Sequence, residues 1–280
     1  MRQQRKTGPA ARTGPAPSTV EDLASRRPFT ARSVVASTLL GVDPPRLPTR
    51  LLVRSGELFG ISPGTTRVAL SRMVAAGELV VDGDSHRLAG RLLDRQARQL
   101  ASRAPATRSW QGDWCLAVVT EPRRPASARA ELRAAMAGLR LVEWREGVWL
   151  RPDNLDEPHS SRRARAVVEA QCHRFVGRPE PADGLAAQLW DLDGWALEAT
   201  RLRSQLAHVV TRFDADDTEA LEPGFVLSAE VLRHLLADPL LPAELLPPDW
   251  PGPALRSDYD RYDDAFKTMW RDWFRRETDR

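Results

Sequence analysis

The chain lacks most features of secreted and membrane-embedded proteins. Only two cysteines, Cys115 and Cys172, occur among its 280 residues, and two are too few for a disulfide framework. No stretch approaches the roughly eighteen uninterrupted apolar residues that a membrane-spanning helix needs. The basic, proline- and glycine-rich start is not followed by the apolar segment of a secretory signal. We therefore expect a disordered basic tail over residues 1–27 and a cytoplasmic protein with no membrane partner.

The signatures of catalysis are missing as well. The sequence has no phosphate-binding loop, no G-x-S-x-G motif, no dinucleotide fingerprint and no H-E-x-x-H pair among its five histidines. Cys172 and His173 are adjacent but have no second pair at metal-ligand spacing, which disfavours a zinc site. Helix ends and a loop explain the aspartates at 191–193 and 214–217 at least as well as a metal does. We expect no catalytic residue, no metal and no cofactor, and hence a protein that is not an enzyme.

Charge gives the first positive signal. A hydrophobic content of 42% and a charged content of 28% fit a soluble globular protein of two or three domains. Residues 1–110 carry 18 Lys and Arg against 8 Asp and Glu, whereas residues 111–280 carry 23 against 30. A basic front half points to a polyanionic partner such as nucleic acid. A basic tail and a solvated arginine-rich face give the same count, so the residue pattern has to decide.

Three helices are expected in the first ordered segment. Apolar residues at the i, i+1, i+4 and i+5 positions from Val34 form one face of a first helix, which Gly41 ends. The prolines of VDPPRLP then interrupt the chain. A second helix is expected over residues 49–60. A third is expected over residues 62–76, because a serine N-cap is followed there by proline at the first helical position.

A hairpin follows the third helix. Residues 79–81 and 86–88 have the composition of strands, and the Asp-Gly pair between them is a strong signal for a tight turn. Three helices followed by a hairpin predict a winged helix-turn-helix over residues 28–90.

The third helix divides into a packing face and an exposed face. One side gathers the residues that we expect to pack on the first two helices: Thr66, Ala69, Leu70, Met73 and Gly77. The opposite side carries small residues flanked by two arginines: Gly64, Val68, Ser71 and Ala75, with Arg67 and Arg72. Small residues allow close entry into a major groove, and arginine reaches guanine edges or phosphates. An ordinary solvated helix face is the alternative interpretation.

Neighbouring residues extend the predicted DNA surface. Ser62 and Thr65 lie at the N-terminus of the third helix, where free backbone N–H groups and the helix dipole favour a phosphate. His86 and Arg87 on the hairpin are placed to touch the minor groove or the backbone, with a solvated wing as an equal alternative for either. The predicted DNA-contacting residues are therefore Ser62, Gly64, Thr65, Arg67, Val68, Ser71, Arg72, His86 and Arg87.

Several motifs resemble one family, the PaaX repressors of phenylacetate catabolism. TTRVALSRMVAAGEL is similar to the family's recognition-helix segment, and SVVASTLLG resembles its first helix. WQGDWCLAVVTE fits its W-x-G-x-W motif, REGVWLRPDNL its G-x-W-L-x-P strand, and DPLLPAELLPPDWPG its C-terminal signature rich in Leu and Pro. These motifs occur in the family's order over about residues 30–265. The winged-helix motif is weakly specific, whereas the C-terminal motif in combination with the others is strong.

The resemblance implies a DNA-binding repressor of a catabolic operon, associated with the nucleoid, that an aryl-acetyl coenzyme A thioester releases from double-stranded operator DNA. It also implies a ferredoxin-like middle domain related to a CRISPR-associated nuclease fold. A metal-dependent nuclease is therefore the alternative function, by analogy of fold alone. The operator, the regulated genes, the inducer and the direction of regulation, repression or activation, stay open.

The remainder of the sequence predicts an α+β unit followed by helices. Residues 91–109 form a linker helix whose apolar residues favour either a homodimer interface or packing within the monomer: Leu92, Leu93, Ala97 and Leu100. Residues 110–182 show a β-α-β-β order, and residues 183–280 are largely helical. We thus expect an α+β chain with a winged helix-turn-helix, a ferredoxin-like middle domain and a helical C-terminal domain.

An effector site is expected behind the DNA-binding domain, because the recognition helix must keep its face free for DNA. The nine tryptophans fit core packing, with an effector pocket as the alternative use of some of them. The acidic rear of the chain would repel a polyanionic thioester, so a local basic patch is required. The visible candidates, which also resemble solvated helix faces, are Arg162, Arg163 and Arg165, or Arg201 and Arg203.

Overall fold

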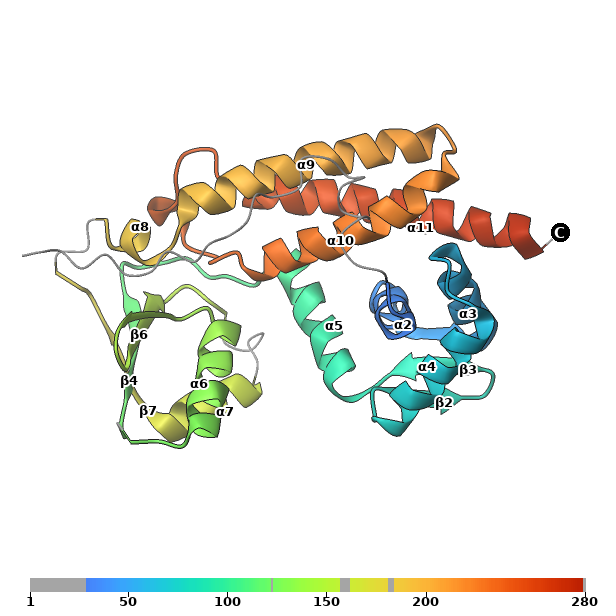
Figure 1. Cartoon of the computed structure of the whole chain (residues 1–280). Helices are drawn as coiled ribbons and strands as arrows, with labels where there is room; N and C mark the ends of the chain where they lie inside the picture. Colours follow the sequence, from blue (N-terminus) through green and yellow to red (C-terminus); the bar gives the residue numbers. More distant parts are fainter. Residues whose placement is uncertain (1–28, 122, 157–161, 181–183, 279–280) are drawn as a thin grey trace, which may run out of the picture.

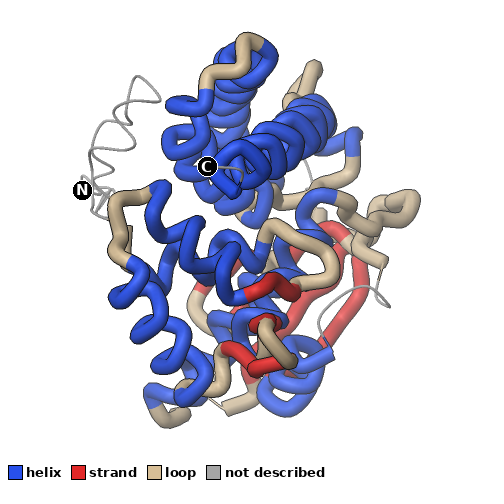
Figure 2. Tube along the Cα trace, turned by 90° about the vertical axis from the view of Figure 1, so that its right-hand side faces the viewer, coloured by secondary structure: helices blue, strands red, loops and turns tan. Residues whose placement is uncertain are grey.

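The computed structural model describes residues 29–121, 123–156, 162–180 and 184–278. The expected basic tail, residues 1–27, lies outside the described residues. The chain is α+β, as expected, with two small antiparallel sheets and long C-terminal helices. In Figure 1 an N-terminal unit and a middle sheet unit lie next to each other, and the C-terminal helices run along both. Figure 2, turned by 90°, shows the same helices above the rest of the chain.

The N-terminal unit contains the three expected helices close to their predicted bounds. Its elements are α2 (Ala31–Leu40), β1 (Arg46–Pro48), α3 (Thr49–Leu58), α4 (Pro63–Ala75), β2 (Leu79–Asp82) and β3 (Ser85–Leu88). Thr30 caps α2 by accepting a hydrogen bond from the backbone N–H of Ser33. The apolar faces of the helices and the sheet enclose a core that includes Leu39, Leu52 and Leu70.

The proline-rich segment after α2 is more than the predicted break, because it contains β1. This strand pairs antiparallel with β3 and gives a three-stranded sheet of order β1-β3-β2. Prolines are tolerated here because β1 is three residues long and lies at the edge of the sheet, where a missing N–H leaves no central ladder broken. The Pro45 carbonyl still accepts a hydrogen bond from the Leu88 N–H at 2.9 Å.

A glycine turn, not a packing contact, explains Gly77. We predicted this residue on the packing face of the third helix, but it is exposed and has a φ of 67°. The Glu78 N–H donates to the Met73 carbonyl at 2.9 Å, and the Gly77 N–H donates to the Val74 carbonyl at 3.0 Å. These two bonds form a Schellman motif, which needs a left-handed residue at this position. The motif turns the chain from α4 directly into β2.

The middle unit has the β-α-β-β order expected from the sequence, completed by a further helix and strand. Its elements are β4 (Trp114–Val119), α6 (Ala126–Gly138), β5 (Val142–Arg145), β6 (Val148–Pro152), α7 (Arg162–Gln171) and β7 (Cys172–Gly177). The strands form an antiparallel sheet of order β5-β6-β4-β7, which is the ferredoxin-like arrangement. One face of the sheet packs on α6 and α7, and on the other Trp114 and Leu150 pack against the C-terminal unit.

The C-terminal unit is helical, as expected. Its elements are α8 (Leu185–Leu189), α9 (Leu192–Asp214), η2 (Thr218–Ala220), α10 (Leu221–Leu236), η3 (Ala243–Leu245) and α11 (Gly252–Thr278). None of the described helices is long and apolar enough to cross a membrane. Most tryptophans pack internally, as in the stack of Trp195 on Trp250, whose ring centroids lie 4.5 Å apart.

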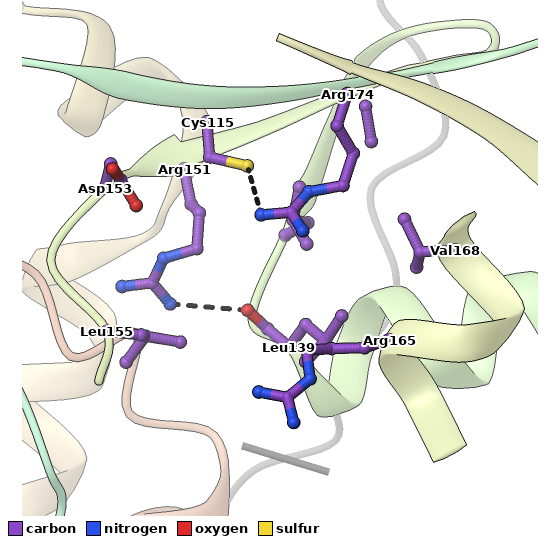
Figure 3. A pocket seen from close by; sticks show the side chains of 10 residues that line it. Cys115, Leu139, Arg151, Asp153, Leu155, Arg165, Val168 and Arg174 are labelled. Carbon is purple, nitrogen blue, oxygen red and sulfur yellow. Dashed lines mark hydrogen bonds between the residues drawn. The ribbon is translucent and has the colours of Figure 1, made fainter. Parts of the chain in front are cut away.

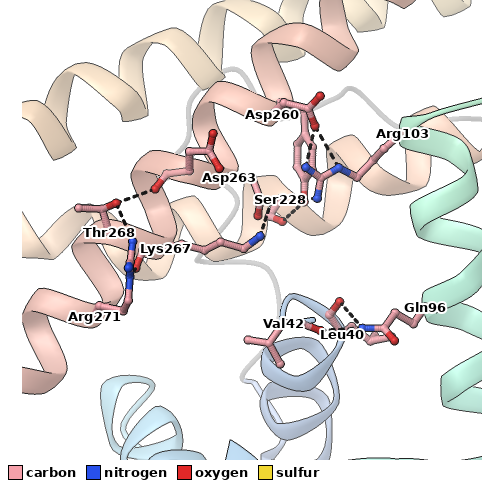
Figure 4. Close-up of polar contacts among 12 residues, drawn as sticks. Leu40, Val42, Gln96, Arg103, Ser228, Asp260, Asp263, Lys267, Thr268 and Arg271 are labelled. Carbon is pink, nitrogen blue, oxygen red and sulfur yellow. Dashed lines mark hydrogen bonds and ion pairs between the residues drawn. The ribbon is translucent and has the colours of Figure 1, made fainter. Parts of the chain in front are cut away.

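One helix, α5 (Gly90–Arg103), connects the N-terminal unit to the other two. Near its start Leu92 is buried in the N-terminal core, so this residue packs within the monomer. The Gln96 side-chain amide donates to the carbonyls of Leu40 at 3.3 Å and Val42 at 2.8 Å, which holds α5 against the end of α2 (Figure 4). At its other end, Arg103 reaches α11.

Candidate nucleic-acid interface

α3 and α4 are joined by a short turn that fixes their crossing. The turn covers residues 59–62, and Gly60 in it has a φ of 68°. Gly56 of α3 faces Thr66 of α4 so closely that a Cβ at position 56 would overlap the threonine side chain. This glycine therefore lets the two helices approach at the point where they cross.

The N-terminus of α4 is capped by the residues that we predicted near a DNA phosphate. The Ser62 hydroxyl accepts a hydrogen bond from the Thr65 N–H at 3.2 Å, and the two hydroxyl oxygens lie 2.9 Å apart. Both residues are exposed. Pro63 begins the helix, where its missing N–H leaves no intrahelical bond unmade. The exposed hydroxyls at the positive end of the helix dipole can therefore face an anion, whereas the Thr65 N–H is already bonded to Ser62.

The two faces of α4 match the predicted division, apart from Gly77. Thr66, Leu70 and Met73 are buried against the first two helices. The predicted DNA-facing residues of the helix are all exposed: Gly64, Thr65, Arg67, Val68, Ser71 and Arg72. Val68, at the centre, is 51% exposed and gives this face an apolar side chain next to the arginines.

The two arginines of this face are without ion pairs to any described residue. Arg67 and Arg72 lie on a helix that contains no Asp or Glu, so no carboxylate on α4 offsets their charge. In Figure 1, α4 lies on the side of the N-terminal unit that faces away from α10 and α11. The structure thus presents a cationic helix face that no other described part of the chain covers.

Of the two hairpin residues predicted to contact DNA, one is exposed and the other is buried. Arg87 is exposed. His86 is buried, and its Nδ1 lies 3.1 Å from the Thr49 hydroxyl. Burial also lowers the pKa of His86. His86 is therefore turned away from the exposed face of the hairpin, because alternate residues of β3 point to opposite faces of the sheet and this ring points inward, and its contact with DNA stays a prediction.

The strand that the sequence pattern missed brings a further arginine to the hairpin. Arg46 of β1 is the direct cross-strand partner of Arg87, so both side chains lie on the same exposed face of the sheet. Arg46 also pairs with Asp82 at 3.0 Å. No local pattern of the sequence predicts that Arg46 pairs with the hairpin, because the two segments are far apart in the chain.

A buried carboxylate fixes α4 and the hairpin to the rest of the unit. Glu78, in the turn between them, has a side chain only 3% exposed and is paired with Arg32 of α2, at 2.6 Å, and with Arg91 of α5. The hydrogen bond from Arg32 is the largest of the effects that lower the pKa of Glu78 to about 2. Three elements are therefore tied at one point, directly beside the exposed face of α4.

Comparison with known proteins assigns the chain part by part. Residues 30–95 match the model of the PaaX-like protein family, residues 107–187 that of the PaaX protein central Cas2-like domain, and residues 190–277 that of the PaaX-like protein C-terminal domain. The chain belongs to the PaaX-like family. The first model covers the whole of the α3–α4 pair and the hairpin.

A solved structure is similar to this PaaX-like protein over most of its length. The uncharacterized protein Rv0674 from Mycobacterium tuberculosis is 44% identical, with a TM-score of 0.67 over 86% of this chain and 97% of the other. No functionally curated protein matches the chain.

The residues that could suggest a metal enzyme have structural roles in this PaaX-like protein. Asp191 caps α9, and Asp217 caps η2 and pairs with Arg212. Cys172 is buried whereas His173 is exposed, since they alternate along β7. Within the described ranges no group of three His, Cys, Asp or Glu is placed to hold a metal ion. No observation supports the nuclease alternative.

Of the two predicted basic patches, the one on α9 is paired with acidic side chains. Arg201 pairs with Glu198 and Glu230, and Arg203 pairs with Asp258. In the other patch, Arg165 lines a small pocket of about 50 Å³ in the middle unit. Figure 3 shows that pocket, where Arg151 and Arg174 also point inward and Arg174 donates to Cys115. Burial lowers the pKa of Arg151 to about 9.

Proposed function

We propose that this PaaX-like protein is a sequence-specific, DNA-binding transcription regulator that inserts α4 into the major groove of operator DNA. Membership of the family implies a transcription regulator. The observation that carries the DNA-binding part is the exposed face of α4, with Arg67 and Arg72 unpaired beside an apolar Val68. The element order of the N-terminal unit, three helices and a sheet ending in a hairpin, supports a winged helix-turn-helix.

Each residue of the face has a chemical role in this proposal. Arg67, in the second turn of α4, reads a guanine edge with two hydrogen bonds, and Val68 contacts a thymine methyl group. Arg72, nearer the end of the helix, contacts a phosphate. Ser62 and Thr65 offer their hydroxyls to a phosphate at the positive end of the helix dipole.

The remaining residues shape and widen the contact. Gly64 and Ser71 have small side chains, which allow the helix to approach the base edges closely. Arg87 on the hairpin contacts the DNA backbone or the minor groove, and Arg46 beside it adds a second cation to the same face.

The test starts from selection of bound sequences out of a random duplex pool, followed by fluorescence anisotropy on the selected operator. Arg67→Ala should weaken binding by about 1–3 kcal/mol and relax preference at one position. Arg133→Ala is the matched control, because it removes an exposed arginine from α6, far from α4 in the chain. Unchanged operator affinity in a folded Arg67→Ala protein would contradict the groove assignment.

We further propose that the regulator acts as a homodimer. One recognition helix covers only a few base pairs, too few for useful specificity in a genome. A two-fold dimer that binds an inverted repeat doubles the number of base contacts. Of the residues that we predicted at an interface on α5, Leu93 is 43% exposed and stays available, whereas Leu92 is buried. Phe175 on the edge strand β7 is also exposed, at 56%, and offers a second surface.

The resemblance to the PaaX repressors supports repression that an aryl-acetyl coenzyme A thioester relieves. Such a ligand must bind the DNA-incompetent arrangement more tightly than the competent one, typically by about 5–150-fold. A reporter under the selected operator distinguishes the two directions of regulation. Deletion of the regulator should raise expression if it represses and lower it if it activates.

A further inference from the structure

The pocket of about 50 Å³ in the middle unit has the size of a small-molecule site. Residues of β4, β6, β7 and α7 line it, together with the segments that follow α6 and β6 (Figure 3). A single water molecule needs about 10–15 Å³ of such space, so the pocket has room for a ligand of about four non-hydrogen atoms. Its lining shows which chemistry that ligand should have.

Three arginines reach this pocket from three different elements. Arg151 comes from β6, Arg165 from α7 and Arg174 from β7, and Figure 3 shows their guanidinium groups at the pocket. Of the described residues that line the pocket, only Asp153 carries a carboxylate, and it pairs with Arg108 at 2.6 Å. The lining therefore has an excess of positive charge, which favours an anionic ligand.

Arg151 is buried without a carboxylate partner. The residue is only 3% exposed, and it forms no ion pair with a described residue. Its guanidinium donates instead to neutral oxygens, which belong to Asn154 at 2.6 Å, Pro152 at 2.9 Å, Leu240 at 3.3 Å and Leu139 at 3.4 Å. Burial lowers the pKa of Arg151 to about 9, and repulsion from Arg140 adds to this effect. A buried charge without a counter-ion is costly, and an anion in the pocket would supply one.

The guanidinium of Arg151 keeps a hydrogen-bond donor for such an anion. Arginine has five N–H donors, and the bonds to neutral oxygens use one at Nε, one at Nη1 and both at Nη2. One N–H of Nη1 is therefore left over. Nη1 is also the atom that contacts the carbonyl of Leu139, a residue of the pocket lining, so it lies at the wall of the pocket (Figure 3).

The rest of the lining is mostly apolar. Its apolar side chains, all buried or half-buried, are those of Ala117, Leu139, Leu141, Leu155 and Val168. An inorganic oxyanion would leave this surface without a matching partner, whereas a methyl group attached to the anion would pack on it. Size, charge and apolar lining together therefore favour a small organic anion over an inorganic one.

We propose that this pocket binds a short-chain monocarboxylate, of which acetate has the size that fits. The carboxylate pairs with the guanidinium groups of Arg151 and Arg174, since arginine binds carboxylates in a planar arrangement of two hydrogen bonds. The methyl group packs on Leu139 and Val168. The site goes beyond the proposed function, because it lies in the middle unit and requires no contact between α4 and DNA.

Protection of a thiol locates the ligand, because Cys115 lines the pocket whereas Cys172, which is also buried, does not. The full chain is treated with methyl methanethiosulfonate, a small thiol reagent, at increasing sodium acetate. Sodium chloride keeps the ionic strength constant, and mass spectrometry follows each cysteine. Acetate at about ten times its Kd should slow the labelling of Cys115 roughly tenfold and leave that of Cys172 unchanged. The dependence on acetate concentration gives the Kd.

Two arginine variants test the cations of the site. Arg174→Ala, at an exposed position, should raise the Kd of acetate about tenfold or more, because a charge-assisted hydrogen bond is lost. Arg133→Ala is the matched control, since it removes an exposed arginine from the same unit that does not line the pocket. Arg151→Met should abolish the protection by acetate. Circular dichroism shows whether this variant folds, and Arg174→Ala decides the matter if it does not.

Sodium nitrate tests the class of ligand. Nitrate has the charge of acetate and the same number of non-hydrogen atoms but no methyl group, so its Kd should be about threefold higher or more. Equal protection by nitrate and acetate would overturn the carboxylate assignment. No selective protection of Cys115, or an unchanged Kd in Arg174→Ala and in folded Arg151→Met, would overturn the site. None of these measurements uses DNA, so their failure would leave the proposed function standing.

Discussion

Gly56 of α3 and Thr66 of α4 meet without space for a single additional carbon atom. Their contact sets the distance between α3 and α4, and α4 carries the proposed DNA face. The Thr66 hydroxyl donates back to the Ser62 carbonyl at 3.3 Å, so the threonine cannot easily rotate away without loss of this bond. The geometry of α4, which we propose to bind DNA, thus depends on a residue that lies outside it.

Gly56→Ala should therefore destabilise the α3–α4 pair by about 1–3 kcal/mol, as overpacking does in other cores. Hydrogen exchange measured on peptides covering residues 49–75 should become roughly 5–150-fold faster. Gly64→Ala is the matched control, because nothing lies within 4 Å of the added methyl group, and it should slow exchange slightly. Equal protection in wild type and Gly56→Ala would contradict the close contact.

The ion pairs of Glu78 predict a dependence of stability on pH. The pKa of Glu78 is lowered to about 2, below its ordinary value of 4.5, so the folded state favours the carboxylate. Its contribution should be fully present above pH 4.5 and should disappear as the pH falls to about 2.

Glu78→Gln should cost about 1.5–3 kcal/mol at pH 7, because hydrogen bonds from two arginines to a charged partner are lost. The measurement is the midpoint of thermal unfolding from pH 7 to pH 2. The difference between wild type and variant should narrow below pH 4.5, and a constant difference down to pH 2 would show that Glu78 is not ionised in the folded protein.

Arg72 should contribute to DNA affinity without contributing to specificity. If it contacts a phosphate, Arg72→Ala weakens binding to all sequences alike and reduces the slope of log K against log salt by about one. Anisotropy titrations on operator and unrelated DNA at several salt concentrations measure both quantities. A change of sequence preference at one position would instead place Arg72 at a base, as proposed for Arg67.

The two exposed apolar surfaces predict different dimers. Light scattering should show a dimer at micromolar concentration, free or bound to operator. Phe175→Glu should produce monomers if the β7 edge carries the contact, and Leu93→Glu should do so if α5 carries it. A monomer of the wild-type chain under both conditions would contradict the dimer itself.

Local sequence patterns were sufficient to predict which face of α4 is exposed and which is buried. The spacing of Thr66, Leu70 and Met73 specifies which side packs, and the serine and proline at its start specify where it begins. Period and capping are properties of neighbouring residues, so a single sequence contains them. The same is true of the β-α-β-β order of elements at the start of the middle unit.

What local patterns missed depends on contacts between distant residues. β1 is a strand because β3, about forty residues later, pairs with it, and no pattern within Arg46–Pro48 announces this. His86 looked available because alternation along a short strand does not say which face is covered. A cavity of about 580 Å³ is also missed, since residues as far apart in the sequence as Gln99 and Trp270 line it from two different units.

The length of α5 gives the molecule a lever arm. Its 14 residues, at a rise of about 1.5 Å each, span about 21 Å from the N-terminal core to the contact of Arg103 with α11. A tilt of about 15°, similar to known subunit rotations, would carry the far end through about 5 Å. In a two-fold dimer both copies would shift, so the distance between the two α4 helices would change by up to twice this displacement. Successive half-sites on DNA are separated by roughly 34 Å. In the proposed dimer, such a tilt would change the distance between the two copies of α4 without changing the side chains that we propose to contact bases.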